Sequence, residues 1–126
     1  MEESKKILIA EDSSVIQKLT KKILENQKYQ ISSAKNGSQV LEMLGQGDFD
    51  LILMDINMPV MNGIECAERI RALKDRKKSI IPIIAITGNA MNYTIEEFKK
   101  AGINDYLQKP INFDRLVLLV NQYANG

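Results

Sequence analysis

Short apolar runs alternate along this chain with longer stretches in which apolar residues recur at helical spacing. The predicted strands are residues 6–10, 29–34, 51–54, 80–86 and 105–108. The predicted helices are residues 13–26, a short one around 40–44, then 63–73, 92–101 and 113–123. Three of the strands are near-continuous β-branched and apolar runs, which is typical of strands buried on both faces. The pattern predicts an α/β fold with a doubly wound, five-stranded parallel sheet and helices on both faces.

Two helices differ in how much apolar surface they offer. The first has apolar residues at positions i, i+4 and i+8, namely Val15, Leu19 and Ile23. The fourth has only three residues that can face a core, namely Ile95, Phe98 and Ala101. Because weakly anchored elements move most easily, we expect the fourth helix to be the mobile one.

The chain has 126 residues and no histidine, which limits its chemistry. This length suits one domain, 1–126. Without histidine there is no Ser-His-Asp or Cys-His arrangement and no histidine-ligated metal. The net charge of +1 argues against direct nucleic-acid binding. Any reaction must therefore use carboxylates, hydroxyls, lysine or a group supplied by a partner.

The cysteine content and apolar runs indicate the compartment. Cys66 is the single cysteine and cannot form an intramolecular disulfide, which fits a reducing environment. We interpret it as a small apolar residue of a helix face rather than a reactive thiol. No apolar run approaches the roughly 20 residues of a membrane span. The sequence predicts a cytoplasmic protein without membrane insertion.

Polar residues follow four of the predicted strands, at the edge where a parallel sheet binds ligands. They are Glu11, Asp12, Asp55, Thr87 and Lys109. Taken singly, four of them have ordinary structural explanations. Asp12 suits a helix N-cap, Asp55 and Thr87 suit turns, and Lys109 suits a solvated position. Glu11 has no such explanation, and the joint placement favours a site.

Three carboxylates at one site require a cation. Two carboxylates about 4 Å apart repel by about 4 kcal/mol at an effective dielectric of about 20. An all-oxygen cluster suits a hard divalent ion, and Mg²⁺ binds through one or two carboxylates together with phosphate. The sequence therefore predicts Mg²⁺ as the cofactor.

The same residues supply a phosphoryl-transfer reaction. A carboxylate of ordinary pKa is ionised at pH 7 and attacks phosphorus without a general base. The metal, Lys109 and Thr87 can then stabilise oxygens of the transferred group. A Walker-type loop is missing from the sequence, so the donor is not ATP itself. These arguments leave open whether Asp12 or Asp55 is the nucleophile.

Four segments resemble the receiver domain of two-component response regulators. They are Ile9-Ala-Glu-Asp12, Leu53-Met-Asp-Ile-Asn-Met-Pro-Val-Met-Asn-Gly63, Ile84-Ala-Ile-Thr-Gly-Asn-Ala-Met91 and Asp105-Tyr-Leu-Gln-Lys-Pro110. The resemblance runs from about residue 6 to residue 123. It implies one receiver domain with the flavodoxin-like strand order 2-1-3-4-5 and a Lys109-Pro110 bond that is commonly cis.

The resemblance also assigns roles. It implies that Asp55 is the phosphoacceptor, that Glu11, Asp12, Asp55 and the Asn57 carbonyl hold Mg²⁺, and that Thr87 and Lys109 contact the phosphoryl group. The implied donor is a phosphohistidine on a sensor histidine kinase or a histidine phosphotransfer protein. Such a domain catalyses only its own phosphorylation and dephosphorylation, and is a signalling switch rather than an enzyme.

The resemblance further implies how the switch works. Thr87 and Tyr106 would couple phosphorylation to the surface of the fourth strand, fourth helix and fifth strand, and so control an output partner that the sequence does not name. Asn57 and Asn89 occupy the positions that tune hydrolysis. Glu11 replaces the more usual aspartate, and Gly88 replaces the more usual alanine, which we expect to keep the site open.

Two other functions share parts of this pattern. A Mg²⁺-dependent phosphatase of the haloacid-dehalogenase type also uses an aspartate nucleophile, but carries a second acid two residues later, where this chain has Asn57. A flavodoxin-like electron carrier needs a hydroxyl-rich phosphate loop after the first strand, where Glu11 and Asp12 would repel the phosphate. Within the receiver family, a stand-alone domain, a phosphorelay intermediate and a module of a hybrid kinase all remain open.

Overall fold

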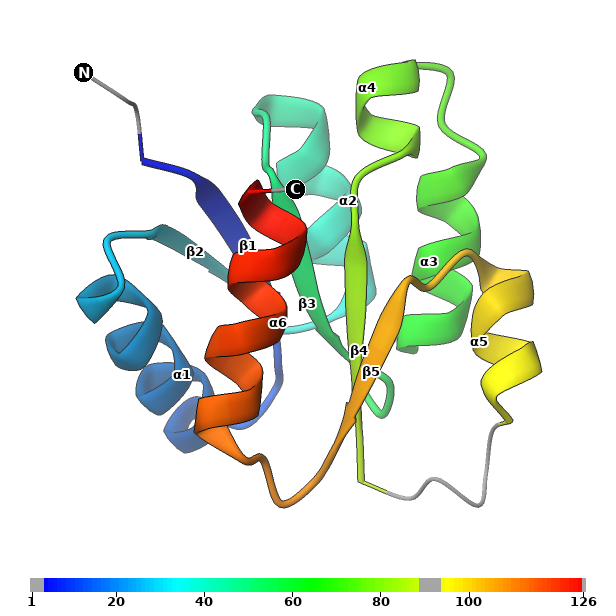
Figure 1. Ribbon diagram of the computed structural model, residues 1–126. Coiled ribbons are helices and arrows are strands. Elements are labelled where there is room, and N and C mark those ends of the chain that lie inside the picture. Colours follow the sequence, from blue (N-terminus) through cyan, green and yellow to red (C-terminus); the bar gives the residue numbers. More distant parts are fainter. Residues whose placement is uncertain (1–3, 89–93, 126) are drawn as a thin grey trace.

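The computed structural model describes residues 4–88 and 94–125. Its centre is one parallel sheet in the order β2-β1-β3-β4-β5. The strands are β1 (Lys6–Ala10), β2 (Gln30–Ala34), β3 (Leu51–Asp55), β4 (Ile83–Thr87) and β5 (Asp105–Gln108). The carboxyl ends of all five strands point to the same edge, the lower edge in Figure 1. The predicted fold class and strand order are confirmed.

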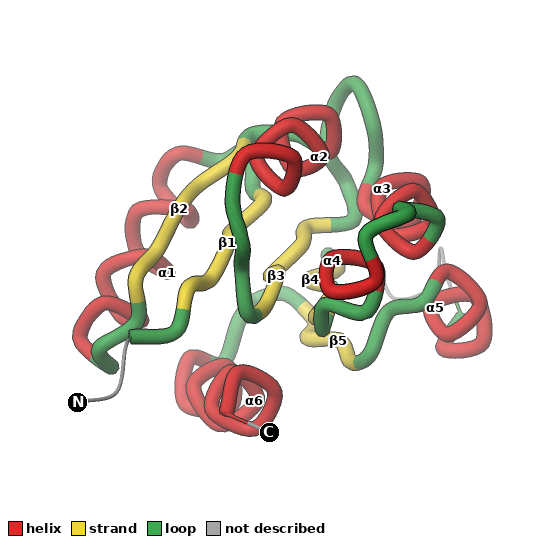
Figure 2. The backbone as a smooth tube through the Cα atoms, turned by 90° about the horizontal axis from the view of Figure 1, so that it is seen from above, coloured by secondary structure: helices red, strands yellow, loops and turns green. Residues whose placement is uncertain are grey.

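Six helices among residues 4–88 and 94–125 surround this sheet. They are α1 (Ser14–Asn26), α2 (Gly37–Gln46), α3 (Gly63–Arg71), α4 (Arg76–Ser79), α5 (Ile95–Ala101) and α6 (Phe113–Asn125). Helices α1 and α6 cover one face, and α2, α3 and α5 lie over the other (Figure 2). None of the helices in the described part of the chain combines the length and apolar character that a membrane crossing needs.

Two separate cores lie on the two faces of the sheet. Successive side chains of a strand point to opposite faces. Ile7 and Ile9 of β1 accordingly join the core under α1 and α6, whereas Leu8 and Ala10 join the core under α2, α3 and α5. Every residue of β3 and β4 is buried. This double burial explains why these strands are continuously apolar in the sequence.

The predicted inner face of α1 is wrong. Val15 is 77% exposed and Leu19 is 46% exposed, whereas Thr20 and Leu24 are buried. The helix carries two adjacent stripes at i, i+4 and i+8 spacing, and a small rotation exchanges them. The observed rotation buries the stripe of Thr20 and places apolar residues in solvent.

The segment before β4 also differs from the prediction. Residues 76–79 form the short helix α4, capped by Asp75, whose carboxylate accepts hydrogen bonds from two backbone N–H groups. Strand β4 therefore begins at Ile83, just after Pro82, and Ile80 lies outside it with 63% exposure. A run of apolar residues does not show where a strand starts.

Helix α5 is shorter than predicted. It begins at Ile95 after a Thr94 capping box, and residues 92 and 93 of the predicted helix lie outside the described residues. Phe98 and Ala101 are buried, but Ile95 is 53% exposed, so the expected apolar face is thinner still. The pattern of a weakly anchored helix holds for the part described.

Close backbone approach positions α3 against the end of β3. A Cβ atom on Gly63 would lie 2.7 Å from the Asp55 carbonyl oxygen, so glycine is required there. The Lys109-Pro110 bond is cis, as the resemblance implies. Cys66 is buried in α3, and burial raises its thiol pKa to about 12. Its burial in the core confirms its interpretation as a small apolar residue of a helix face.

Candidate functional site

The polar residues predicted at the strand ends meet at one place in the structure. Asp55 and Thr87 are the last residues of β3 and β4, while Glu11 and Lys109 follow β1 and β5. One carboxylate oxygen each of Glu11, Asp12 and Asp55 lies within 4.8 Å of the others. The structure thus brings together residues that lie up to 98 positions apart in the chain.

Lys109 is held by two carboxylates. Its Nζ lies 3.1 Å from Asp55 Oδ2 and 3.5 Å from Glu11 Oε1. Partial burial lowers the pKa of Lys109, but the hydrogen bond and charge of Asp55, together with the charge of Glu11, outweigh it and raise the pKa. The interpretation of Lys109 as a solvated surface charge is therefore excluded.

Glu11 is buried beside another acid. Its pKa rises to about 7, chiefly because burial disfavours the charged form and because it shares the site with Asp55. A hydrogen bond from the Ser13 backbone N–H, 3.1 Å from Oε2, opposes this rise. Oε1 accepts no hydrogen bond from the described residues. One lysine does not balance the negative charge here, and a divalent cation fits the donor set.

The alternative explanations for Asp12 and Asp55 differ in outcome. Ser13, not Asp12, is the N-cap of α1, because its Oγ accepts from the Ile16 backbone N–H at 3.4 Å. Asp12 is exposed beside the buried acids. Asp55 does support a turn, since its Oδ1 accepts from the Asn57 N–H at 3.1 Å, but its other oxygen meets Lys109.

The Thr87 hydroxyl is buried at the end of β4. It is 1% exposed, and its Oγ1 has no hydrogen-bond partner among the described residues. A buried hydroxyl without a hydrogen bond costs about 1–3 kcal/mol, which makes Thr87 a candidate donor to a ligand at this site. The backbone holds it in place, because its carbonyl accepts from the Lys109 N–H at 2.8 Å.

Glycine at position 88 has a smaller steric effect on the site than expected. A Cβ atom there would lie 3.7 Å from Lys109 Cδ, an ordinary van der Waals contact. An alanine would therefore fit, and the expectation that glycine keeps the site open receives no steric support. The predicted tuning residue Asn89 lies outside the described residues, and Asn57 is exposed at the rim of the site.

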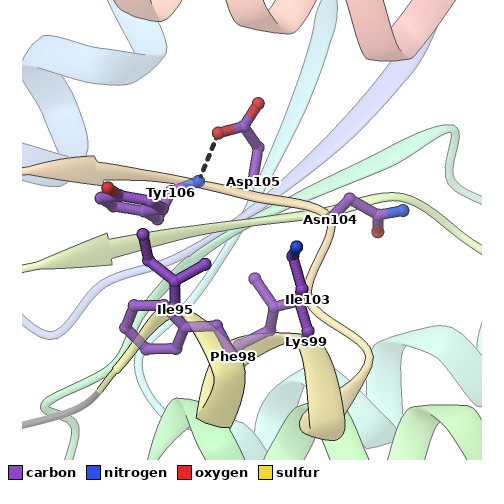
Figure 3. Close-up of a pocket in the computed structure, with 7 residues that line it drawn as sticks. All are labelled: Ile95, Phe98, Lys99, Ile103, Asn104, Asp105 and Tyr106. Carbon is purple, nitrogen blue, oxygen red and sulfur yellow. Dashed lines mark hydrogen bonds between the residues drawn. The ribbon is translucent and has the colours of Figure 1, made fainter.

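Tyr106 is half-buried in a groove between α5 and β5 (Figure 3). Its ring lies 5.8 Å from that of Phe98, tilted by 39°. The groove has a volume of about 170 Å³, and Ile95 and Ile103 also line it. The tyrosine predicted to report phosphorylation thus contacts the helix predicted to move.

Sequence reasoning missed two features beside the site. The first is an open apolar groove of about 260 Å³ next to Lys109, lined also by Ile16, Leu19, Pro110, Ile111 and Phe113. The signal was present, because Val15 and Leu19 form a clear stripe that was assigned to the core. The second is Gln17, a polar residue in a helix, for which the sequence carries no signal.

Comparison with known proteins places this geometry in a family. The family model described as the response regulator receiver domain matches residues 7–121. The chain belongs to the response regulator receiver domain family. It is 39% identical over 121 residues to hybrid signal transduction histidine kinase I of Dictyostelium discoideum, covering 92% of this chain and 7% of that protein. It is 38% identical over 120 residues to the histidine kinase BarA of Escherichia coli K12, covering 95% and 13%.

Solved receiver structures have the same fold. The receiver domain of sensor histidine kinase PA1611 of Pseudomonas aeruginosa, with magnesium in its active site cleft, matches with TM-score 0.88 and 31% identity, covering 98% of this chain and all of that one. A chain in the co-crystal of Saccharomyces cerevisiae Ypd1 with the Ssk1 receiver domain matches with TM-score 0.87 and 28% identity, covering 97% and 90%. This receiver domain spans a small part of its curated relatives, 7% and 13% of the two kinases.

Proposed function

We propose that this receiver domain accepts a phosphoryl group on Asp55 from a phosphohistidine of a histidine kinase or histidine phosphotransfer protein. The observation that carries the assignment is the environment of Asp55, buried, bonded to Lys109 and next to two further carboxylates. In the step, an Asp55 oxygen forms the new bond to phosphorus while the P–N bond breaks. The electron pair stays on the donor imidazole, so this chain needs no histidine.

The remaining residues position and neutralise the group. Glu11, Asp12, Asp55 and the Asn57 carbonyl would hold Mg²⁺, which supplies positive charge to phosphoryl oxygens. Lys109 neutralises another oxygen, and the unpaired Thr87 hydroxyl donates to a third. Asn57 and Asn89, both neutral amides, would set how fast water removes the phosphoryl group. The domain would catalyse only these reactions on itself.

The deciding experiment measures intact mass. The chain is incubated with Mg²⁺ and a small phosphodonor such as acetyl phosphate, with Asp55→Asn as the comparison. We expect a phosphoryl mass gain that is lost in the variant. A wild type without the gain would contradict the function, whereas a variant that keeps it would contradict only the assignment to Asp55. Release of phosphate from other small substrates would instead favour the haloacid-dehalogenase alternative.

The donor protein would dock on the apolar groove beside Lys109. Leu19 lines this groove and is 46% exposed, and the groove shares Lys109 with the acceptor site. A protein that brings an imidazole to Asp55 would also cover the surface around Lys109. A matching crystal structure contains a phosphotransfer protein with a receiver domain, which supports such a complex.

A charge on this surface separates docking from chemistry. We expect Leu19→Glu to slow transfer from a phosphotransfer protein that phosphorylates the wild type, while phosphorylation by acetyl phosphate stays unchanged. Ile80→Glu is the matched control, because Ile80 is an exposed apolar residue at the opposite end of the sheet. Equal transfer rates for both variants would place docking elsewhere.

The output would involve Thr87, Tyr106 and the surface of β4, α5 and β5. Thr87 would turn toward the phosphoryl group, and Tyr106 would follow in its groove against α5. Thr87→Ala should keep phosphorylation of Asp55 and lose the difference in hydrogen exchange of α5 between the two states. An unchanged difference would contradict the coupling of Thr87 to α5.

We also propose a cytoplasmic location, which the single cysteine supports.

A further inference from the structure

Gln17 links α1 to the ends of two strands. Its side-chain amide donates one hydrogen bond to the Glu11 carbonyl and one to the Ala34 carbonyl, both at 3.1 Å. Ala34 is the last residue of β2, and its carbonyl also accepts from the Glu11 backbone N–H at 3.0 Å. One amide group therefore closes a small network around the main chain of Glu11.

This network determines the direction of the peptide between Glu11 and Asp12. Among the hydrogen bonds of the described residues, the Glu11 carbonyl receives its donor from Gln17. Asp12 is exposed and is not the helix cap, so the position of its carboxylate beside the buried acids depends on the main chain that carries it. Gln17 thus holds the backbone from which two of the three clustered carboxylates extend.

We propose that Gln17 is a positioning residue for the cation site, which keeps Glu11 and Asp12 in a metal-binding arrangement before the metal arrives. The proposal rests on the function above, in which these acids hold Mg²⁺. Groups that orient ligands without touching the metal commonly affect affinity by about 10- to 100-fold. Because Gln17 does not contact the phosphoryl group or Asp55, its effect falls on Mg²⁺ affinity and not on the transfer step.

The experiment removes the two donors while keeping the side-chain length. Isothermal calorimetry measures Mg²⁺ binding to the intact chain without phosphodonor, for the wild type and for Gln17→Met. We expect the Kd of the variant to rise about 10-fold, and amide exchange of Asp12 and Ser13 to accelerate without metal. At saturating Mg²⁺ the phosphorylation rate with acetyl phosphate should equal that of the wild type.

Gln39→Met is the matched control. Gln39 also hydrogen-bonds a loop at the same edge of the sheet, through Oε1 and the Lys35 backbone N–H at 2.8 Å, but makes no contact with Glu11. We expect its Mg²⁺ affinity to stay at the wild-type value.

The outcomes separate the two proposals. Wild-type protein that does not bind Mg²⁺ contradicts the proposed metal site itself. Wild-type protein that binds Mg²⁺, with an equal Kd for Gln17→Met, overturns the role of Gln17. If Gln17→Met does not fold, the side-chain amide NMR signals of wild-type Gln17 decide: protection from exchange and a shift on Mg²⁺ addition support the role, and unprotected, unmoved signals overturn it.

Discussion

Two partly buried cations lie at opposite ends of the sheet, and their surroundings differ in kind. Lys109, at the carboxyl ends of the strands, meets the carboxylates of Asp55 and Glu11, and Glu11 Oε1 accepts no hydrogen bond from the described residues. Arg71, the last residue of α3, lies at the amino ends of β4 and β5 and meets uncharged acceptors. Its guanidinium donates to the carbonyls of Gly102, Ser79 and Ile81 at 2.6–2.9 Å, and to Asn104 Oδ1 at 3.0 Å.

The difference separates a structural hydrogen-bond network, around Arg71, from a candidate ligand site, around Lys109. Each nitrogen of the Arg71 guanidinium has acceptors, so this end fastens α3 to the loops that enter β4 and β5. Burial lowers the pKa of Arg71. Around Lys109 the buried Thr87 hydroxyl and one Glu11 carboxylate oxygen have no hydrogen bond to the described part of the chain. Fully satisfied networks rigidify a fold, whereas unsatisfied buried groups mark places where a ligand completes the structure.

The largest expected effect on stability comes from removing the hydrogen bonds of Arg71. Arg71→Met should lower the free energy of unfolding by about 3 kcal/mol, because several carbonyls lose their donors. Urea unfolding measures it, and phosphorylation of Asp55 by acetyl phosphate should continue in the folded fraction. Arg69→Met, which removes an exposed ion pair with Glu65, is the control and should cost about 0.5 kcal/mol. Similar losses for both variants would remove the distinction between the two ends.

The second test examines the close contact between the Arg71 side chain and Gly102. Gly102 has φ of +88° and follows α5, and a Cβ atom there would lie 2.5 Å from the Arg71 side chain. Gly102→Ala should cost about 2 kcal/mol, from left-handed backbone strain and displacement of Arg71. Thermal unfolding checks this. In the double variant with Arg71→Met, the loss of unfolding free energy should be smaller than the sum of the losses in the two single variants.

The third test addresses the charge imbalance at the other end. The folded-state pKa of Glu11 is about 7, above its ordinary value of 4.5. Between these values the folded state binds more protons than the unfolded state, so stability without metal should fall by about 1–2 kcal/mol as pH rises from about 4.5 to 7.5. Thermal unfolding at a series of pH values measures the slope. Glu11→Gln should flatten it, and an equal slope in this variant would assign the imbalance to another group.

The smallest effect concerns backbone strain beside the site. Val60 has φ of +70° and is 82% exposed, a left-handed conformation that a β-branched residue rarely adopts. Val60→Asn should stabilise the fold by about 1 kcal/mol, because asparagine tolerates this conformation. A melting curve detects it, with Val15→Asn, in ordinary helix, expected to show no gain. A Val60→Asn variant without added stability would show that the strain is relieved in solution.

Much of the site was predictable from the sequence because parallel strands end at one edge. Glu11, Asp55, Thr87 and Lys109 each follow a recognisable strand, so their meeting required only the fold class. The rotation of α1 was not predictable, because the stripe of Val15 and Leu19 is more apolar than the stripe that is buried. The role of Arg71 was hidden for a related reason: a basic residue at a helix end is normally solvated, and its acceptors come from segments up to 33 residues away.

By itself the sequence determined the sheet, its burial on both faces and the set of polar residues at its carboxyl edge, since apolar periodicity and strand direction depend on local order. Only the tertiary structure decided which of these groups are paired. It placed Lys109 between Asp55 and Glu11, and it turned α1 so that Gln17 bonds the Glu11 carbonyl. It also left the Thr87 hydroxyl without a hydrogen bond to any described residue. Hydrogen bonding depends on tenths of an ångström between segments that are distant in the sequence. A hydropathy pattern does not predict those distances.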